Sequence, residues 1–258
     1  MSARFLSPAA MLLLCAMLAG CASSAEREAE QEKLNKRAET HVLLGSGYMQ
    51  RGQLDVAKQE LDKAYDLAPG NSQVNNMMAL LQWRLNNRDA AARHFRKAVD
   101  AEPPNPEAWN NYGVFLCEYG KIDEALAWFQ KAAANAFYRT PEEANLNAGV
   151  CLMKKPAPVA AEKYFREALR INPRMPGALY QMARISLDSG RALTARAFIE
   201  RYFHAAEDTP ESLLLAVKIE RALHNKNAEA SYALRLRGKF PTSPEAGQLQ
   251  TLSGARKK

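Results

Sequence analysis

The apolar residues between Trp109 and Ala132 follow the spacing of two short helices. In the first half they recur at steps of three and four residues, which places them on one face of a helix, and the second half repeats this pattern. A turn signal at Gly120, followed by the acidic pair Asp123 and Glu124, separates the halves. The stretch therefore predicts a helical hairpin that needs neighbours to bury its apolar faces. These faces consist of Trp109, Tyr112, Gly113 and Leu116, then Ala125, Phe129 and Ala132.

The same spacing returns along most of the chain at a nearly constant step. Successive units begin 34 residues apart, except for one step of 36 residues between the third and the fourth unit. Helical hairpins at this period are the sequence signature of tetratricopeptide repeats, which this chain resembles. Each hairpin buries its apolar faces on its neighbours, so such repeats build a solenoid. The units begin at Ala38, Ser72, Pro106, Glu142, Pro176 and Pro210.

The fold class predicted from this pattern is all-α. No stretch shows the period of two that is typical of a half-buried strand, and the repeats give a superhelical solenoid of about six helix-turn-helix units over residues 38–243. Small residues such as Gly113 and Gly149 stand where the two helices of a unit cross, and large residues such as Phe129 and Phe165 fill the space between units. We expect these residues to be core rather than a ligand site.

Residues 1–20 have the composition of a targeting segment. Arg4 supplies a positive start, and the apolar run after it is shorter than a comfortable membrane span. The run ends in Leu18-Ala19-Gly20-Cys21, which resembles a bacterial lipobox. Residues 1–20 are therefore predicted to be a lipoprotein signal peptide, and Cys21 is predicted to carry the acyl chains. The alternative is an ordinary secretory signal with an unrelated cysteine.

The two ends of the body have polar flanks. Residues 21–37 are rich in Ala, Ser, Glu, Gln and Lys, and we expect a lipidated tether that merges into the first helix. Ala22, rather than an aspartate, follows the cysteine; by resemblance to lipoproteins of Gram-negative bacteria, this favours the outer membrane, with the body in the periplasm. Residues 244–258 are small, polar and basic, and we expect a flexible tail.

The first helices of the units carry candidate binding residues. On a tetratricopeptide solenoid these helices line the concave surface, and positions 2, 5, 9 and 12 of each unit point away from the core. Several of these positions are apolar in the first two units, which indicates a groove for a partner. The alternatives are a register error of one residue and a groove covered by the N-terminal segment. The groove candidates are Val42, Met49, Asn76, Leu80, Trp83, Asn110, Val114 and Leu146.

Two cysteines remain once Cys15 and Cys21 are assigned to the signal and the lipid anchor. Cys117 and Cys151 stand late in the first helices of adjacent units, at positions 12 and 10. In an oxidising periplasm they are candidates for a disulfide, provided that their Cα atoms approach within about 7 Å. The alternative is a pair of buried free thiols. No spacing typical of a metal site is present.

Composition and charge narrow the function classes. The chain has 258 residues, is 47% hydrophobic and 24% charged, and carries a formal charge of +7. Acidic residues are spread among the basic ones and no basic run is interleaved with aromatics, which argues against nucleic-acid binding. The four histidines lie in different units without evident partners, and no nucleophile elbow or phosphate loop is found. We expect no catalysis, cofactor, metal or small-molecule substrate, but a surface that holds a peptide or a partner helix.

The order of features carries a closer resemblance. Together with the lipobox and the six repeats, the segments Asn110–Cys117, Asn145–Cys151 and Phe240–Ser243 resemble the type IV pilus biogenesis lipoproteins over about residues 15–245. The resemblance implies a pilotin in the outer membrane that binds the type IV pilus secretin subunit and promotes its localisation and multimerisation. It implies neither a cofactor nor catalysis. A general periplasmic scaffold for cell-wall enzymes and an accessory of outer-membrane protein assembly stay open as alternatives.

Overall fold

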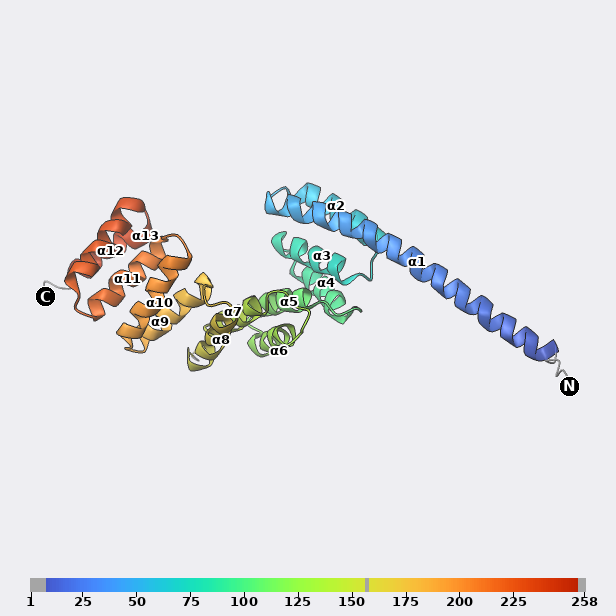
Figure 1. Ribbon diagram of the computed structural model, residues 1–258. Helices are drawn as coiled ribbons and strands as arrows, with labels where there is room; N and C mark the ends of the chain where they lie inside the picture. Colours follow the sequence, from blue (N-terminus) through green and yellow to red (C-terminus); the bar gives the residue numbers. More distant parts are fainter. Residues whose placement is uncertain (1–7, 156–157, 255–258) are drawn as a thin grey trace, which may run out of the picture. The chain divides into compact units, whose positions relative to one another are not determined.

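The computed structural model describes the backbone of residues 8–155 and 158–254, and the side chains of residues 26–155 and 159–249. Within these ranges every regular element is an α-helix, which confirms the predicted fold class (Figure 1). The helices are α1 (Pro8–Gln50), α2 (Leu54–Leu67), α3 (Ser72–Arg84), α4 (Arg88–Asp100), α5 (Pro106–Glu118), α6 (Ile122–Ala133), α7 (Pro141–Leu152), α8 (Pro158–Ile171), α9 (Pro176–Asp188), α10 (Ala192–Ala205), α11 (Pro210–Ala222), α12 (Lys226–Lys239) and α13 (Pro244–Gly254).

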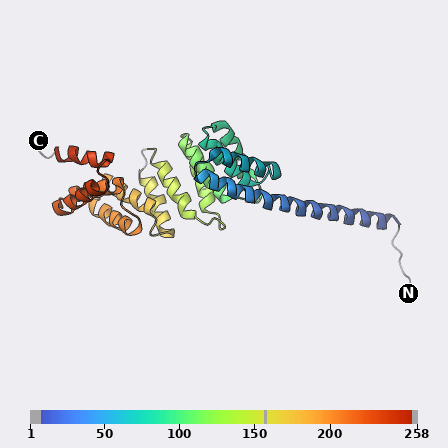
Figure 2. The same cartoon turned by 90° about the horizontal axis from the view of Figure 1, so that it is seen from above.

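The helices pack as successive hairpins, and Figure 2 shows the same pairs from a second side. The chain forms two compact units, Met1–Tyr112 and Gly113–Lys258. In the N-terminal unit α1 pairs with α2 and α3 pairs with α4. In the C-terminal unit the pairs are α7 with α8, α9 with α10, and α11 with α12. The first helices α3, α5, α9 and α11 begin at the residues where the 34-residue period places them.

Five of the hairpins turn through a residue in the left-handed backbone region. Gly52, Gly120 and Gly190 have φ of 73°, 77° and 73°, and Asn86 and His224 take the same place in their units with φ of 59° and 56°. The amide of the next residue donates to a carbonyl five residues before it, as from Gln53 to Tyr48 at 2.9 Å. This is the Schellman end of a helix, which satisfies carbonyls that the helix itself leaves open. All five residues stand at position 15 of the repeat.

In the third and fourth hairpins the two helices approach closely because glycine stands at their crossing. A Cβ atom on Gly113 would lie 2.7 Å from Cε1 of Phe129, and one on Gly149 would lie 2.5 Å from Cε1 of Phe165. Both phenylalanines are almost fully buried. The small residues therefore act as predicted, and the phenylalanines fill the space at the crossing. At the next interface Tyr112 stacks on Phe95 of the preceding hairpin, with 5.6 Å between ring centroids.

The prediction of a flexible tail is wrong for residues 244–254. Residues 244–254 form α13, which packs on α11 and α12, and Ala246 and Leu249 are buried there beside Leu213. Pro244 stands 34 residues after Pro210, so α13 takes the place of a seventh first helix. It covers the apolar end of the last hairpin, as the end of a repeat array requires. Residues 255–258 lie outside the described part.

The predicted tether is continuous with the first helix. Residues 26–37 lie within α1, carry mostly exposed side chains and hold i,i+3 and i,i+4 ion pairs such as Lys36 with Glu32 at 2.7 Å. Figure 1 shows α1 extending well past α2. Residues 1–7 of the predicted signal peptide, and the side chain of Cys21, lie outside what the structure describes.

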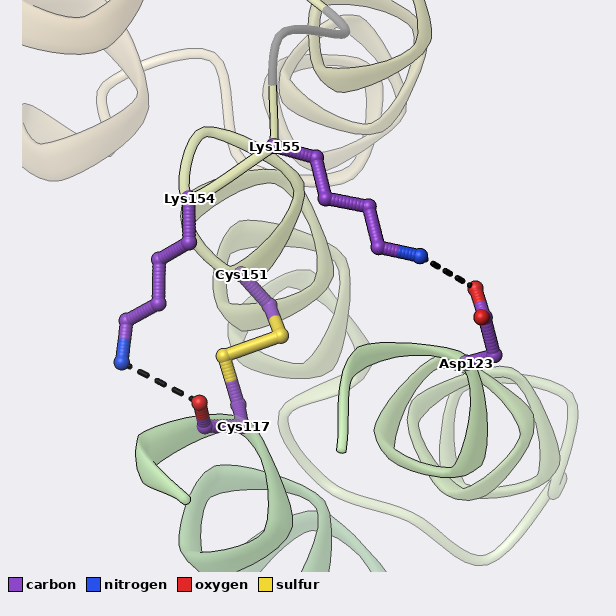
Figure 3. The surroundings of a disulfide bond; sticks show 5 residues. All are labelled: Cys117, Asp123, Cys151, Lys154 and Lys155. Carbon is purple, nitrogen blue, oxygen red and sulfur yellow. Dashed lines mark hydrogen bonds and ion pairs between the residues drawn. A yellow bond between two sulfur atoms is a disulfide. The ribbon is translucent and has the colours of Figure 1, made fainter. Parts of the chain in front are cut away.

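A disulfide joins the first helices of the third and fourth hairpins. Cys117 at the end of α5 and Cys151 at the end of α7 are bonded, and their Cα atoms lie 5.8 Å apart (Figure 3). Beside the bond, Nζ of Lys154 donates to the carbonyl oxygen of Cys117 at 3.2 Å, and Lys155 pairs with Asp123 of α6 at 2.8 Å. One covalent and two polar contacts thus hold the same junction, which lies entirely within the C-terminal unit.

A largely buried carboxylate stabilises a second junction between hairpins in the same unit. Glu162 of α8, with 16% of its side chain exposed, accepts from both Nη atoms of Arg191 at 3.1 and 2.8 Å and also pairs with Arg166. The hydrogen bond from Arg191 is the main cause that lowers the pKa of Glu162, against burial, which raises it. Because Arg191 belongs to the next hairpin, the pair ties α8 to the start of α10.

We expect the combined change Cys117→Ser and Cys151→Ser to lower the free energy of unfolding by about 3–4 kcal/mol, because the bond closes a loop of 34 residues in the unfolded chain. Urea unfolding followed by circular dichroism would measure this loss. Reductant should lower the midpoint of the wild type and leave that of the double variant unchanged. Equal midpoints of the two oxidised proteins would contradict a stabilising role.

The Glu162→Gln variant should lose about 1–2 kcal/mol of unfolding free energy at pH 7. The folded pKa of Glu162 is lowered, so its ionised form stabilises the fold above the unfolded pKa, and this contribution disappears as the pH falls through the folded value below 4.5. Urea midpoints at pH 7 and pH 3 should therefore converge for variant and wild type. Glu167→Gln, which removes an exposed pair within α8, is the matched control and should change little. A difference that persists unchanged at pH 3 would refute the ionic explanation.

Candidate partner-binding face

Two of the eight predicted groove residues belong to the core instead. Val42 is 2% exposed and Met49 is 4% exposed, and both join the apolar cluster of the first hairpin. The reason is that α1 packs on α2 and on α3 at once, so positions 5 and 12 of the first unit face a neighbouring helix. The prediction that these two side chains line an open groove is wrong.

Asn76 and Asn110 are also too buried to line an open surface. Asn76 is 1% exposed and Asn110 is 8% exposed, at position 5 of successive first helices. The Nδ2 of Asn111 donates to Oδ1 of Asn76 at 3.2 Å, which satisfies the amide between α3 and α5. Position 5 is therefore an interface position in the first three units, and the groove prediction is wrong for these two asparagines as well.

The remaining groove candidates keep part of their surface. Leu80, Trp83, Val114 and Leu146 are half-buried. Leu80 packs against the edge of the N-terminal core, and the ring of Trp83 meets that of Phe95 edge-on at 6.3 Å. These two residues lie one helical turn apart on α3, so they present a joint apolar surface in the N-terminal unit.

Leu146 lies between the first helices of two hairpins. A Cβ atom on Gly177 would be 2.9 Å from Cδ2 of Leu146, so the leucine occupies the room that a glycine leaves on α9. Its role is therefore mainly structural. At position 9 of the third unit, Val114 is half-buried, and Val150 at the equivalent position of the next unit is 39% exposed. Side chains at position 9 of the first helices therefore keep exposed surface that a partner can contact.

Two exposed leucines on α1 were missed by the sequence pattern. Leu43 is 70% exposed and Leu44 is 46% exposed, although Leu44 stands at position 7, which is buried in the next units by the preceding hairpin. Tyr112 at the same position stacks on Phe95 in this way. Leu44 belongs to the first unit, so no preceding hairpin covers it. Its place at the head of the array was the signal that could have revealed the exposure.

A basic side chain closes the end of the preceding first helix at two junctions. Nη1 of Arg84 donates to the carbonyl oxygen of Met49 at 2.6 Å, and Nζ of Lys154 donates to that of Cys117 at 3.2 Å. Both donors stand at position 13 and both acceptors at position 12 of the unit before. A cation at a helix C-terminus also interacts favourably with the helix dipole. These two cations are thus engaged in repeat packing.

Two histidines of the described structure contact polar side chains of a neighbouring helix. Nδ1 of His41 lies 2.7 Å from Glu60, whose pKa is lowered by Lys63 first and by His41 next. His94 contacts Asn75 at 3.1 Å, and burial lowers its pKa. Among the described residues no three His, Cys, Asp or Glu side chains gather in a way that could hold a metal ion. These contacts are between helices and serve packing.

None of the helices in the described ranges combines sufficient length with sufficient apolar content to cross a bilayer.

Known families match the repeat body. Models of the tetratricopeptide repeat match residues 38–71, 76–139 and 143–219. The type IV pilus assembly protein PilF of Pseudomonas aeruginosa is 26% identical over 94% of this chain and 97% of its own length. The three matches and the relative together span all the hairpins whose geometry is described above.

Solved structures agree with this relationship. The structure of Pseudomonas aeruginosa PilF aligns with a TM-score of 0.77 at 26% identity, covering 85% of this chain and 99% of PilF. The crystal structure of PilW, a widely conserved type IV pilus biogenesis factor, aligns with a TM-score of 0.76 at 31% identity, covering 84% of this chain and 99% of PilW. The chain therefore belongs to the tetratricopeptide-repeat family of type IV pilus biogenesis proteins that includes PilF and PilW.

Proposed function

We propose that this protein is an outer-membrane pilotin, which binds the type IV pilus secretin subunit and promotes its localisation and assembly into a ring. The observation that carries the proposal is the 31% identity to PilW, a type IV pilus biogenesis factor, over 84% of this chain and nearly all of PilW. The fold agrees with this role, because tetratricopeptide hairpins present helix faces that hold a segment of another protein.

The proposed anchor is a set of acyl chains on Cys21, which ends a sequence that resembles a lipobox. More than one chain is needed for a stable hold on a membrane. The backbone between Cys21 and Ala38 is helical as part of α1 and would span about 25 Å. The helix therefore acts as a spacer that keeps the repeat body away from the lipid, on the periplasmic side of the outer membrane.

The proposed contact in the N-terminal unit consists of Leu80 and Trp83 on α3. Both are half-buried apolar side chains, so a partner would gain mainly by covering apolar surface. A secretin segment held there during transport would be kept from assembling in the inner membrane. The acyl chains would meanwhile take the complex along the lipoprotein-sorting route.

In a strain that lacks this protein, detergent-resistant secretin multimers should vanish from the outer-membrane fraction while secretin monomer accumulates. The multimers can be measured by immunoblotting of unheated membrane fractions. A panel of unrelated outer-membrane barrels serves as the control and should be unchanged. Persistence of the multimers would overturn the pilotin proposal, and a loss of many barrels at once would favour a general assembly accessory.

The anchor is tested in the same strain by complementation. The chain with Cys21→Ser should be folded and resistant to proteolysis but absent from the outer-membrane fraction, because it carries no acyl chain. If it still fractionates with the outer membrane, the proposed anchor is refuted even when the secretin result stands.

Complementation with Leu80→Ser and Trp83→Ser together should reduce secretin multimers at least about fivefold, a loss of about 1 kcal/mol or more in binding. Circular dichroism must show unchanged helicity. Leu193→Ser with Leu234→Ser is the matched control, since these two leucines are each 70% exposed on the second helices α10 and α12. Wild-type multimers in the Leu80 and Trp83 variant would exclude this surface as the contact.

A further inference from the structure

The ninth position of the repeat changes character along the C-terminal unit. The first helices α5, α7, α9 and α11 carry two valines and then two cations at this position. We call these four residues the ninth-position row: Val114, Val150, Arg184 and Lys218. All four belong to the compact unit Gly113–Lys258, so their order along the row is set within one body.

Contacts within this unit show that the four helices lie side by side. The disulfide between Cys117 and Cys151 joins α5 to α7. Leu146 of α7 packs on Gly177 of α9. Helix α9 in turn contacts α11. Neighbouring packed helices lie about 10 Å apart, so the row runs across the unit in steps of about that length.

All four residues of the row keep exposed surface, and its two cations have no ion-pair partner among the described residues. Val150 is 39% exposed, Lys218 is exposed, and Val114 and Arg184 are half-buried. Within the described structure Arg184 and Lys218 form neither an ion pair nor a hydrogen bond. Most arginines of this unit are paired or bonded to backbone, as Arg196 is with Glu220 at 2.7 Å. Two unpaired cations on one face are therefore available to an external anion.

The charge of the chain is concentrated in the same unit. Residues 113–258 hold 22 Lys and Arg against 15 Asp and Glu, whereas residues 1–112 hold 13 of each, so the whole excess of +7 lies in the C-terminal unit. Such an asymmetry attracts acidic partners and guides their approach.

The exposed carboxylates of α7 and α11 stand near the N-terminal ends of these helices. Glu143 on α7 and Glu211 on α11 occupy position 2, about 10 Å along the helix axis from the ninth-position row. Helix α9 has Gly177 there, so no carboxylate stands opposite Arg184 on its own helix. The acidic groups on the cationic side are Asp188, at position 13 of α9, and Glu220 of α11, which is buried and paired with Arg196.

An unpaired acceptor accompanies the row. The carbonyl oxygen Oε1 of Gln181 is buried and has no hydrogen-bond partner within the described residues. Gln181 stands three residues before Arg184, on the adjoining part of the same face of α9. A buried acceptor without a partner is costly, and a backbone amide of a bound segment would supply the missing donor.

We propose that the ninth-position row binds an extended partner segment that is apolar at one end and acidic at the other. A segment in the polyproline II conformation advances about 3.1 Å per residue with three residues per turn, so every third residue points to the same side and would meet the next helix of the row. The segment therefore places two apolar residues on the valines and two carboxylates on Arg184 and Lys218, over about ten residues. This inference rests on the proposed function, since it names the chemistry of the partner that the pilotin would hold.

The test uses the full chain in detergent micelles and fluorescent twelve-residue peptides. One peptide carries Leu at its residues 1 and 4 and Asp at its residues 7 and 10 on a Ser and Thr background, and a second has the same residues in reverse order. A third peptide carries Lys in place of Asp. Fluorescence anisotropy at low and high salt gives the affinities.

One orientation of the acidic peptide should bind at least about tenfold more tightly than the lysine peptide, with a Kd that rises with salt. Arg184→Glu with Lys218→Glu should weaken it at least about tenfold. The matched control is Lys163→Glu with Arg237→Glu, which changes the net charge equally at two exposed, unpaired cations on the second helices α8 and α12. Equal binding of the acidic and lysine peptides, no binding of any peptide, or an equal loss in the control would overturn the proposal.

The two proposals fail in different experiments. In one outcome, peptide binding depends on Arg184 and Lys218 while a strain without the protein keeps its secretin multimers. That result would support binding at the ninth-position row and refute the pilotin function. If the multimers require the protein but the acidic peptide binds the Arg184 and Lys218 variant as well as it binds the wild type, the pilotin role stands and the row falls.

Discussion

The close crossing of two helices over a small residue is the contact on which most of the hairpins depend, with glycine in three of them and Ala79 and Ala183 in two others. Gly113 and Gly149 leave no room for a Cβ atom against the phenylalanine of the facing helix, and Leu61 fills the same place opposite Gly45. Adding a methyl group there would force an almost fully buried ring or backbone to move. Because the hairpin angle is fixed at this point, the outer faces of both helices are fixed as well. The next hairpin therefore meets a surface of constant shape.

Because each hairpin presents a similar surface, hairpins can stack one after another. The first and the last hairpin each lack one neighbour, so the 34-residue pattern does not predict which of their residues are buried. At the head of the array Leu44 lacks the preceding hairpin that covers Tyr112, so a consensus core position becomes surface. At the tail α13 supplies a further first helix and buries Leu249 against the last hairpin. Leu44 is thus exposed at one end, where no preceding hairpin packs on it, whereas the other end is covered because α13 packs there.

The structural features that depend only on the 34-residue period can be predicted from the sequence. The hairpins, the starts of the first helices and the small residues at the crossings all follow from a 34-residue step. Burial at positions 5 and 12 did not, because it depends on how near the next first helix lies. The period alone therefore predicts Val42, Met49 and Asn76 to be surface residues, although α3 or Asn111 covers them. The left-handed turn at position 15 was visible as glycine in three units, but Asn86 and His224 adopt it too.

Specific function requires positions that the packing leaves free to vary. Position 8 is held by the crossing, position 7 by the preceding hairpin, position 12 by neighbouring first helices or a disulfide, and position 13 in part by helix ends. In the C-terminal unit position 9 has none of these structural roles, and there the chain changes from Val114 and Val150 to Arg184 and Lys218. Variation confined to a position without structural duties is what a binding surface on a repeat scaffold needs, since its chemistry can change while the fold stays the same.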